Sequence, residues 1–225
     1  MKNENLNTTS SDRLTRALLT SGIIAGPLYI LIGVIQILIR PGFDPARHDL
    51  SLMSNGDLGW IQIMNFVLTG LLTIASAIGM WRVLHGGKGG TWGPLLVALY
   101  GLGLIGAGIF VADPALGFPH GTPADADSIS THGLMHFVTG GLGFLALIAA
   151  CLVFARRFHV LKQNGWAVFS LITGILFFAA FFGIAAGSQM GGSILVFVTL
   201  AFTAAVVLAW TWVSALSAQL LNNFV

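Results

Sequence analysis

The residues of this sequence best suited to chemistry by type and spacing are His132 and His136. They stand four positions apart at the start of a long apolar stretch. In an α-helix, four residues turn through about 400°, so both imidazoles leave one helix face, roughly 6 Å apart along the axis. Two stacked imidazoles at the end of an apolar helix are suited to binding a metal ion or a proton.

The composition predicts an integral membrane protein. Of the 225 residues, 56% are hydrophobic and 8% are charged, a balance that excludes an ordinary soluble domain. A helix that crosses a bilayer needs about 20 mostly apolar residues. Stretches of this kind occupy residues 18–39, 60–84, 92–112, 130–155, 165–186 and 193–216. They lack the polar and apolar alternation of β-barrel strands.

The predicted fold class is therefore all-α, a polytopic bundle of six transmembrane helices over residues 18–216. A polar segment, residues 1–17, precedes the bundle, and a short tail, residues 217–225, follows it. The first stretch is predicted to be an uncleaved anchor, because a signal peptide has a shorter apolar core and a small-residue cleavage site. The single cysteine, Cys151, excludes an internal disulfide.

The basic residues predict which way the bundle faces. They gather in the N-terminal segment and in the second and fourth connections, whereas the first connection has only Arg40 and Arg47. Connections rich in Lys and Arg stay in the cytoplasm, so both termini are predicted to face it from the plasma (inner) membrane. Topology thus explains the basic residues, which give no support to nucleic-acid binding. Tryptophans near span ends are predicted to lie at the interfaces: Trp60 outside, and Trp81, Trp92, Trp166, Trp210 and Trp212 inside.

Polar residues gather in the half of the bundle predicted to face outward. Gln62, Asn65 and Thr69 follow a spacing of three and four, which places them on one face of the second span. A polar group at membrane depth normally faces a partner or a water-filled cavity. An outward-opening pocket is predicted from these residues together with Gln36, Arg47, His48, Asp49, Ser51, Asp113, His120, His132 and His136.

Two local patterns have structural interpretations. Gly101, Gly103 and Gly106 match the dinucleotide-binding pattern, but in the middle of a membrane span they predict close helix packing.

The first connection is nearly twenty residues long, a length typical of a functional loop or of one that folds over something. Its alternative interpretation is two turns, at Asp44-Pro45 and Asn55-Gly56, with solvated charges. Candidate N-cap residues of the fourth span are Asp127, Ser128 and Ser130.

Several strings resemble one family of membrane proteins. They are Pro41-Gly42-Phe43-Asp44-Pro45 with Arg47, His48 and Ser51; Gly59-Trp60 with Gln62, Asn65 and Phe66; Asp113-Pro114; and His132-Gly133 with His136. Over residues 18–216 the chain resembles the family catalogued as domain of unknown function 998. That resemblance implies a prokaryotic inner-membrane protein with about six spans, and it implies no activity.

A looser resemblance concerns His48, Ser51, Asp113, His132 and His136. In type and membrane side these residues are similar to polar groups of the CREST membrane hydrolases, which include alkaline ceramidases and progestin/adiponectin-type receptors. Those proteins have seven spans, against six predicted here. The resemblance implies a zinc ion held by the histidine pair and a hydrolytic reaction.

The first hypothesis is a metal-dependent hydrolase for a lipid or amphipathic substrate. A divalent metal such as zinc would be held by His132, His136 and either His48 or His120, with water in the fourth position. The metal would lower the pKa of that water to about 7. Asp113 would orient or deprotonate the water, and Ser51 or Asn65 would hydrogen-bond the developing oxyanion. The substrate pocket would be formed by Gln36, Arg47, Gln62, Thr69 and His120.

The second hypothesis is a small-molecule transporter or binding protein in which His132, His136 and Asp113 titrate. A third hypothesis is haem or quinone chemistry. A haem needs axial ligands from opposite sides, and two histidines on one helix face do not supply both. Two simpler alternatives stay open. The histidines would be hydrogen-bonded polar groups without a metal, or the chain would be a structural or accessory subunit.

Overall fold

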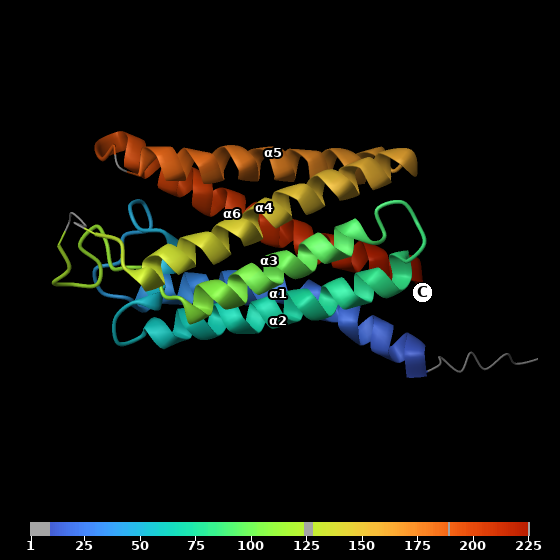
Figure 1. Ribbon diagram of the computed structural model, residues 1–225, viewed down its shortest axis with the longest axis horizontal. Coiled ribbons are helices and arrows are strands. Elements are labelled where there is room, and N and C mark those ends of the chain that lie inside the picture. Colours follow the sequence, from blue (N-terminus) through green and yellow to red (C-terminus); the bar gives the residue numbers. More distant parts are fainter. Residues whose placement is uncertain (1–9, 124–127, 189, 225) are drawn as a thin grey trace, which may run out of the picture.

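The computed structural model describes residues 10–123, 128–188 and 190–224, and these form a helical bundle (Figure 1). The helices are α1 (Ser10–Ile39), α2 (Gly59–Leu84), α3 (Trp92–Ile109), α4 (Thr131–Val160), α5 (Asn164–Gly187) and α6 (Gly192–Phe224), with a short 3-10 helix, η1 (Leu50–Ser54), between α1 and α2. Among the described residues, six helices are long and apolar enough to cross a membrane, and there is no β-strand. The predicted all-α, six-span class is confirmed.

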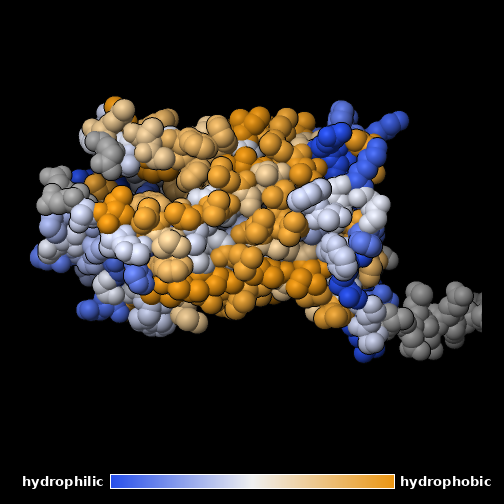
Figure 2. Space-filling view, in the orientation of Figure 1, coloured by the Kyte–Doolittle hydropathy of each residue, from blue (hydrophilic) through white to orange (hydrophobic). Residues whose placement is uncertain are grey.

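The helices close into a ring. Each one packs against its neighbours in sequence, and α6 returns to pack against α1. On the face that Figure 2 shows, a belt of hydrophobic surface crosses the middle of the bundle, and hydrophilic surface lies at both ends. One end, called here the first-loop end, carries the α1–α2 and α3–α4 connections; the other, the termini end, carries the α2–α3 and α4–α5 connections (Figure 1).

Helix α3 ends at Ile109, before residue 112 where the third span was expected to end. The chain is extended at Phe110, and Asp113 then precedes Pro114, a position that disfavours the helical conformation. Asp113 therefore lies beyond α3 and not in its last turn. Ser130 is the N-cap of α4, its hydroxyl accepting a hydrogen bond from Gly133 N at 3.0 Å, whereas Asp127 lies outside the described residues.

Glycines place α3 in close contact with both of its neighbours. A Cβ on Gly70 would lie 2.7 Å from the carbonyl oxygen of Gly101, and one on Gly103 would lie 2.6 Å from Cα of Gly143. Real Cβ atoms do not approach backbone this closely. The glycine pattern of the third span is thus a packing surface towards α2 and α4, as predicted from its sequence context.

The core of the ring is aromatic. Trp210 of α6 stacks on Tyr29 of α1 at 4.8 Å between ring centroids, and Trp212 lies 5.8 Å from Phe154. Both tryptophans have 0% exposure. The face of α6 that carries them packs inward against α1 and α4. Their predicted depth at the inner membrane interface stays a prediction.

A second, smaller apolar cluster covers the first-loop end. It joins the α1–α2 connection to the α3–α4 connection through Phe43, Leu52, Met53 and Phe118. Asn55 extends this link by donating a hydrogen bond to Ala112 O at 3.0 Å. The long first connection therefore folds over the bundle end instead of extending into solvent.

The close contact between α3 and α4 generates a stability prediction. Gly103→Ala is expected to lower the free energy of unfolding by about 1–3 kcal/mol, because the new methyl group would overlap backbone of α4. The measurement is denaturant unfolding of the purified protein in detergent micelles. Gly140→Ala on α4 is the matched control, since a Cβ there meets nothing within 4 Å. Equal effects of the two substitutions would contradict the packing assignment.

Candidate functional site

Three carboxamide side chains meet inside the bundle near the first-loop end. Gln36 of α1 donates from Nε2 to Oε1 of Gln62 on α2 at 2.7 Å. Asn65, one turn further along α2, donates from Nδ2 to the same oxygen at 3.4 Å and to the carbonyl oxygen of Tyr29 at 3.3 Å. The exposed fractions of Gln36, Gln62 and Asn65 are 0%, 0% and 1%. These residues are called here the amide cluster.

Each member of the amide cluster has one buried polar atom without a hydrogen-bond partner. The unpaired atoms are Oε1 of Gln36, Nε2 of Gln62 and Oδ1 of Asn65. The Tyr29 phenol lies close enough to interact with the Gln62 side chain. The amide nitrogen of Gln62 nevertheless has no well-formed hydrogen bond. Two acceptors and one NH2 group therefore remain unpaired in one small region, whereas buried polar groups are normally paired.

Thr69, the remaining residue of the predicted polar stripe, and Thr73, one turn further on, are both satisfied within their own helix. The Thr69 hydroxyl donates to Asn65 O at 2.6 Å, and the Thr73 hydroxyl donates to Thr69 O at 2.7 Å. Both residues have 0% exposure. Thr69 therefore borders the amide cluster without offering it a free hydroxyl proton.

His136 is held by the end of α3. Its Nδ1 lies 2.8 Å from the carbonyl oxygen of Phe110 and 3.1 Å from that of Ala107. Because carbonyl oxygens only accept, Nδ1 carries a proton, so in the neutral form of the ring the lone pair is on Nε2. The Phe66 ring lies 6.3 Å from His136 and 6.1 Å from Tyr29 between centroids, so Phe66 connects His136 to the surroundings of the amide cluster.

His132 differs from His136 in its environment. It is exposed, and its ring lies against Phe110 at 5.9 Å between centroids. The spacing of four does place both histidines near Phe110, as the helical geometry predicts. One of the pair is nevertheless buried and hydrogen-bonded, and the other faces outward.

Asp113 joins the end of α3 to the start of α4. Its carboxylate accepts hydrogen bonds from the backbone N of Ser130 at 2.8 Å and from the Ser130 hydroxyl at 2.5 Å. Gly133 makes room for this contact, because a Cβ there would lie 2.0 Å from Oδ2 of Asp113. A carboxylate at a helix N-terminus is favourably placed for the dipole of α4.

His48 joins the two connections at the first-loop end. Its Nδ1 accepts from the backbone N of Asp44 at 2.9 Å, and its Nε2 lies 3.2 Å from the carbonyl oxygen of Leu116. The ring also packs against Phe43 and Phe118. Both ring nitrogens are therefore engaged in protein hydrogen bonds.

The other predicted site residues lie on the connections at this end. Ser51 is half-buried in η1, where its carbonyl oxygen accepts from the Ser54 hydroxyl at 2.6 Å. Arg47 and His120 are exposed. The structure thus brings Gln36, Gln62 and Asn65 into direct contact, and it places Asp113 and His136 at the α3–α4 junction.

Two ionisable groups of the first connection have environments that the sequence did not indicate: Arg40, which was given no place in the predicted pocket, and Asp49, which was placed there as a polar lining residue. Arg40 donates to the Asn55 carbonyl oxygen and lies over the Phe118 ring, with its NH1 buried and unpaired. Asp49 has Oδ1 buried and unpaired, and burial raises the pKa of this carboxyl to about 6. A signal for Arg40 was available, because it is one of only two basic residues in a connection that the charge bias places outside.

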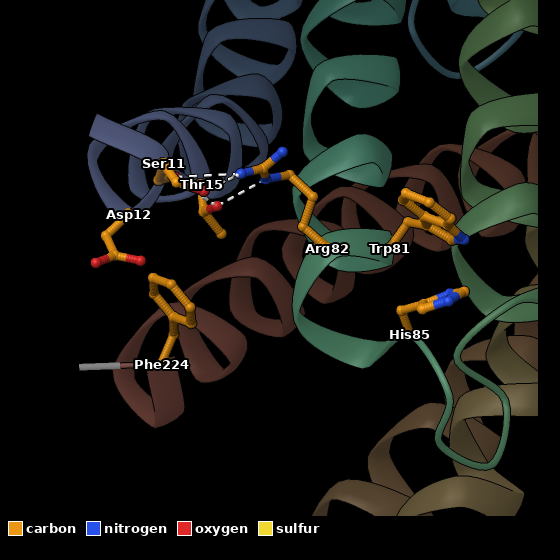
Figure 3. A pocket seen from close by; sticks show the side chains of 7 residues that line it. All are labelled: Ser11, Asp12, Thr15, Trp81, Arg82, His85 and Phe224. Atoms are coloured by element: carbon orange, nitrogen blue, oxygen red, sulfur yellow. Dashed lines mark hydrogen bonds between the residues drawn. The ribbon is translucent and has the colours of Figure 1, made fainter. Parts of the chain in front are cut away.

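Two cavities lie among the described residues of the termini end. One, of about 290 Å³, lies between the start of α1, the end of α2 and Phe224 (Figure 3). In it Arg82 turns towards α1 and donates to the Thr15 hydroxyl at 2.8 Å and to the Ser11 hydroxyl at 2.7 Å (Figure 3). Arg82 therefore ties α2 to α1. The other cavity, of about 400 Å³, lies between the α2–α3 connection and the end of α4.

The comparison with known proteins identifies one family. The model of a family described as "Protein of unknown function (DUF998)" matches residues 23–219, which is most of the chain. No curated protein and no solved structure matches the chain. The family resemblance inferred from the sequence strings is confirmed.

The Asp113 contact predicts a structural effect of a residue that was selected as catalytic. Asp113→Ala is expected to lower the free energy of unfolding by about 1.5–3 kcal/mol, because two donors at the start of α4 lose a charged acceptor. The measurement is a double-mutant cycle with Ser130→Ala in detergent unfolding. Coupling between the two sites is expected, since they are in direct contact. Ser128→Ala, an exposed serine nearby, is the control, and wild-type stability of Asp113→Ala would refute the assignment.

Proposed function

We propose that the chain, which belongs to this family of proteins of unknown function, is a multi-pass membrane protein that binds a small neutral polar molecule, or the polar head of an amphipathic one, at the amide cluster. The observation that carries the proposal is the convergence of three buried carboxamides, each with an unpaired polar atom. Binding is the step common to a transporter and to a receptor-like protein.

The energetics favour a ligand over simple helix packing. An unpaired buried polar atom destabilises a fold by about 1–3 kcal/mol, and whole domains are stable by only about 5–15 kcal/mol. Three such atoms in one place are a substantial fraction of that stability. Apolar side chains of similar size would avoid this loss, so the amides are better explained by a partner that completes their hydrogen bonds.

The chemistry of the cluster indicates what that partner carries. Gln36 and Asn65 each offer a free acceptor, and Gln62 offers a free NH2 donor. A hydroxyl or primary amide group supplies both a proton and a lone pair, and so complements this set. The three carboxamides carry no formal charge, and the Tyr29 and Phe66 rings lie beside them. A neutral ligand with an apolar portion therefore fits best.

A pair of substitutions tests the binding site. Gln36→Met together with Gln62→Met is expected to leave the stability of the ligand-free protein unchanged or higher, because both partners of one hydrogen bond are replaced by apolar groups of similar shape. The same variant is expected to lose stabilisation by ligand. The measurement is the shift in melting temperature of detergent-purified protein against a panel of amides, alcohols, polyols and monoacylglycerols.

The control is Thr73→Val, which removes a hydroxyl at 0% exposure that is already bonded to its own helix. This variant should keep the ligand response of the wild type. The proposal fails if no compound in the panel shifts the wild-type protein, or if the double variant responds as strongly as the wild type.

Metal-dependent hydrolysis is the second candidate, and the geometry of His136 favours it. Metal-binding histidines usually donate their other ring N–H to a backbone carbonyl or carboxylate, which orients the coordinating nitrogen. His136 has this arrangement, since Nδ1 is held by Phe110 O and Nε2 keeps the lone pair. His132 and His120 are the remaining candidate ligands, because both ring nitrogens of His48 are hydrogen-bonded. Among the described residues no three His, Cys, Asp or Glu side chains already lie together as a metal site, so a metal ion would have to draw these two exposed histidines towards His136. A zinc ion bound there would supply an activated water.

Metal content tests this second candidate directly. Detergent-purified wild-type protein is expected to contain about one zinc ion per chain, the number expected for a site of three protein ligands, and His132→Ala with His136→Ala is expected to lose it. Elemental analysis gives the readout, and size-exclusion chromatography checks folding. His159→Ala removes a histidine from the other end of α4 and should retain the metal. A well-folded, metal-free wild type would eliminate the hydrolase candidate.

A further inference from the structure

The larger cavity at the termini end has a strongly basic lining. It is formed by Lys88, Gly89 and Trp92 on one side and by Val153, Arg156, Arg157 and Val160 of α4 on the other. Three of these seven residues are cations, and none is acidic. With a volume of about 400 Å³, the cavity is large enough for the head group of a lipid.

Arg157 supplies a buried donor with no partner. Its NH1 donates to the carbonyl oxygen of Lys88 at 2.6 Å, which fastens the α2–α3 connection to α4. Its Nε is buried and makes no hydrogen bond. Gly89 lets the connection approach α4, since its φ is +72° and a Cβ there would lie 3.2 Å from Val153 Cγ1. The guanidinium is thus fixed in place with an unused N–H.

The start of α3 adds to the positive potential. Helix α3 begins at Trp92, and the preceding Thr91 makes no side-chain hydrogen bond to the first turn. The N-terminal end of a helix carries a partial positive charge and attracts anions. Lys88 and Trp92 therefore bring a cation and a helix N-terminus to the side of the cavity that faces Arg156 and Arg157.

The apolar lining limits which anions fit. Val153 and Val160 form part of the wall, and Trp92 is 64% exposed beside them. The hydrophilic surface of the termini end adjoins the hydrophobic belt of the bundle (Figure 2). A bound molecule with a phosphate at the cations and hydrocarbon towards the belt would contact both the basic and the apolar parts of the lining. A free phosphate would leave the apolar walls uncovered.

We propose that this cavity binds the phosphate group of an anionic phospholipid, with Lys88, Arg156 and Arg157 around the phosphate and Trp92 against the glycerol and upper acyl region. The topology of the chain accounts for basic residues at this end. It does not require three of them to line one cavity, or one of them to keep a buried, unpaired Nε. A phosphate oxygen in the cavity would accept charge-assisted hydrogen bonds from the guanidinium groups of Arg156 and Arg157 that line it.

Native mass spectrometry of the full-length protein in detergent tests the proposal. Delipidated wild-type protein is titrated with dioleoyl phosphatidylglycerol and, separately, with dioleoyl phosphatidylcholine. One phosphatidylglycerol molecule is expected to bind with clear preference over phosphatidylcholine. Each cation near a membrane surface contributes about a fivefold gain in affinity for an anionic lipid. Lys88→Gln with Arg156→Gln, which leaves the Arg157 anchor intact, is therefore expected to weaken binding roughly 25-fold.

Lys162→Gln is the matched control, because Lys162 follows α4 at the same end and does not line the cavity. It removes a positive charge and should leave the preference unchanged. The proposal is overturned if wild-type protein binds the two lipids equally, or if the control weakens binding as much per charge as the double variant does. It is also overturned if glycerol 3-phosphate or inorganic phosphate displaces the lipid at comparable concentration, since the site would then serve a soluble phosphate.

Discussion

Close contact of α3 with α2 and α4 is the constraint on which the rest of the structure depends. Gly70 faces Gly101 on one side of α3, and Gly103 faces Gly143 on the other, at separations that no side chain would fit. This contact fixes the end of α3 beside the start of α4. The Phe110 carbonyl then reaches His136, and the Asp113 carboxylate reaches Ser130. Glycines in the middle of the helices therefore position polar groups about two to four turns away.

The first connection depends on the same junction. Asn55 donates to Ala112 O just beyond α3, and His48 reaches Leu116 O further along the α3–α4 connection. Phe43 and Phe118 pack edge to face beneath them, with 5.3 Å between their centroids. The two connections thus form one cover over the first-loop end.

The fold class could be predicted from the sequence because the hydrophobicity that marks each span extends over a long segment. Each span needs only length and an apolar average, and the described helices coincide with the predicted stretches apart from their ends. The ends differ where local chemistry decides, as at Asp113-Pro114, which stops the chain from continuing α3. The pairing of Gln62 and Asn65 was also predictable, because helical spacing alone places them on one face.

The roles of individual site residues were less predictable because they depend on contacts between distant segments. Nothing near His48 in sequence indicates that its Nε2 will meet Leu116, 68 positions away. The partner of Asp113, Ser130, lies 17 positions away, and the length of the connection between them does not indicate that the two residues will meet. The predicted membrane orientation already explained the basic residues at the termini end. Their charge alone therefore did not indicate that they line one cavity.

The other buried hydroxyl and indole groups of the bundle help to interpret the amide cluster. Ser76 and Ser217 pair across α2 and α6 at 3.0 Å, and Trp212 donates to the Ser170 hydroxyl at 3.0 Å. The interior can therefore satisfy polar groups between helices. In the amide cluster, by contrast, one polar atom of each side chain stays unpaired. Trp210, which stacks on Tyr29, also has a buried nitrogen without a partner.

The absence of formal charge in the three carboxamides limits the charge of the proposed ligand. An ion moved to such a site would lose its hydration at a cost of several kcal/mol, and three neutral amides would not replace a counter-ion. Uncharged hydrogen-bonding groups lose far less on burial and gain the full set of unpaired partners. The proposed ligand of the amide cluster would therefore carry a neutral polar group, whereas the cavity at the termini end, with three cations in its lining, would suit an anionic one.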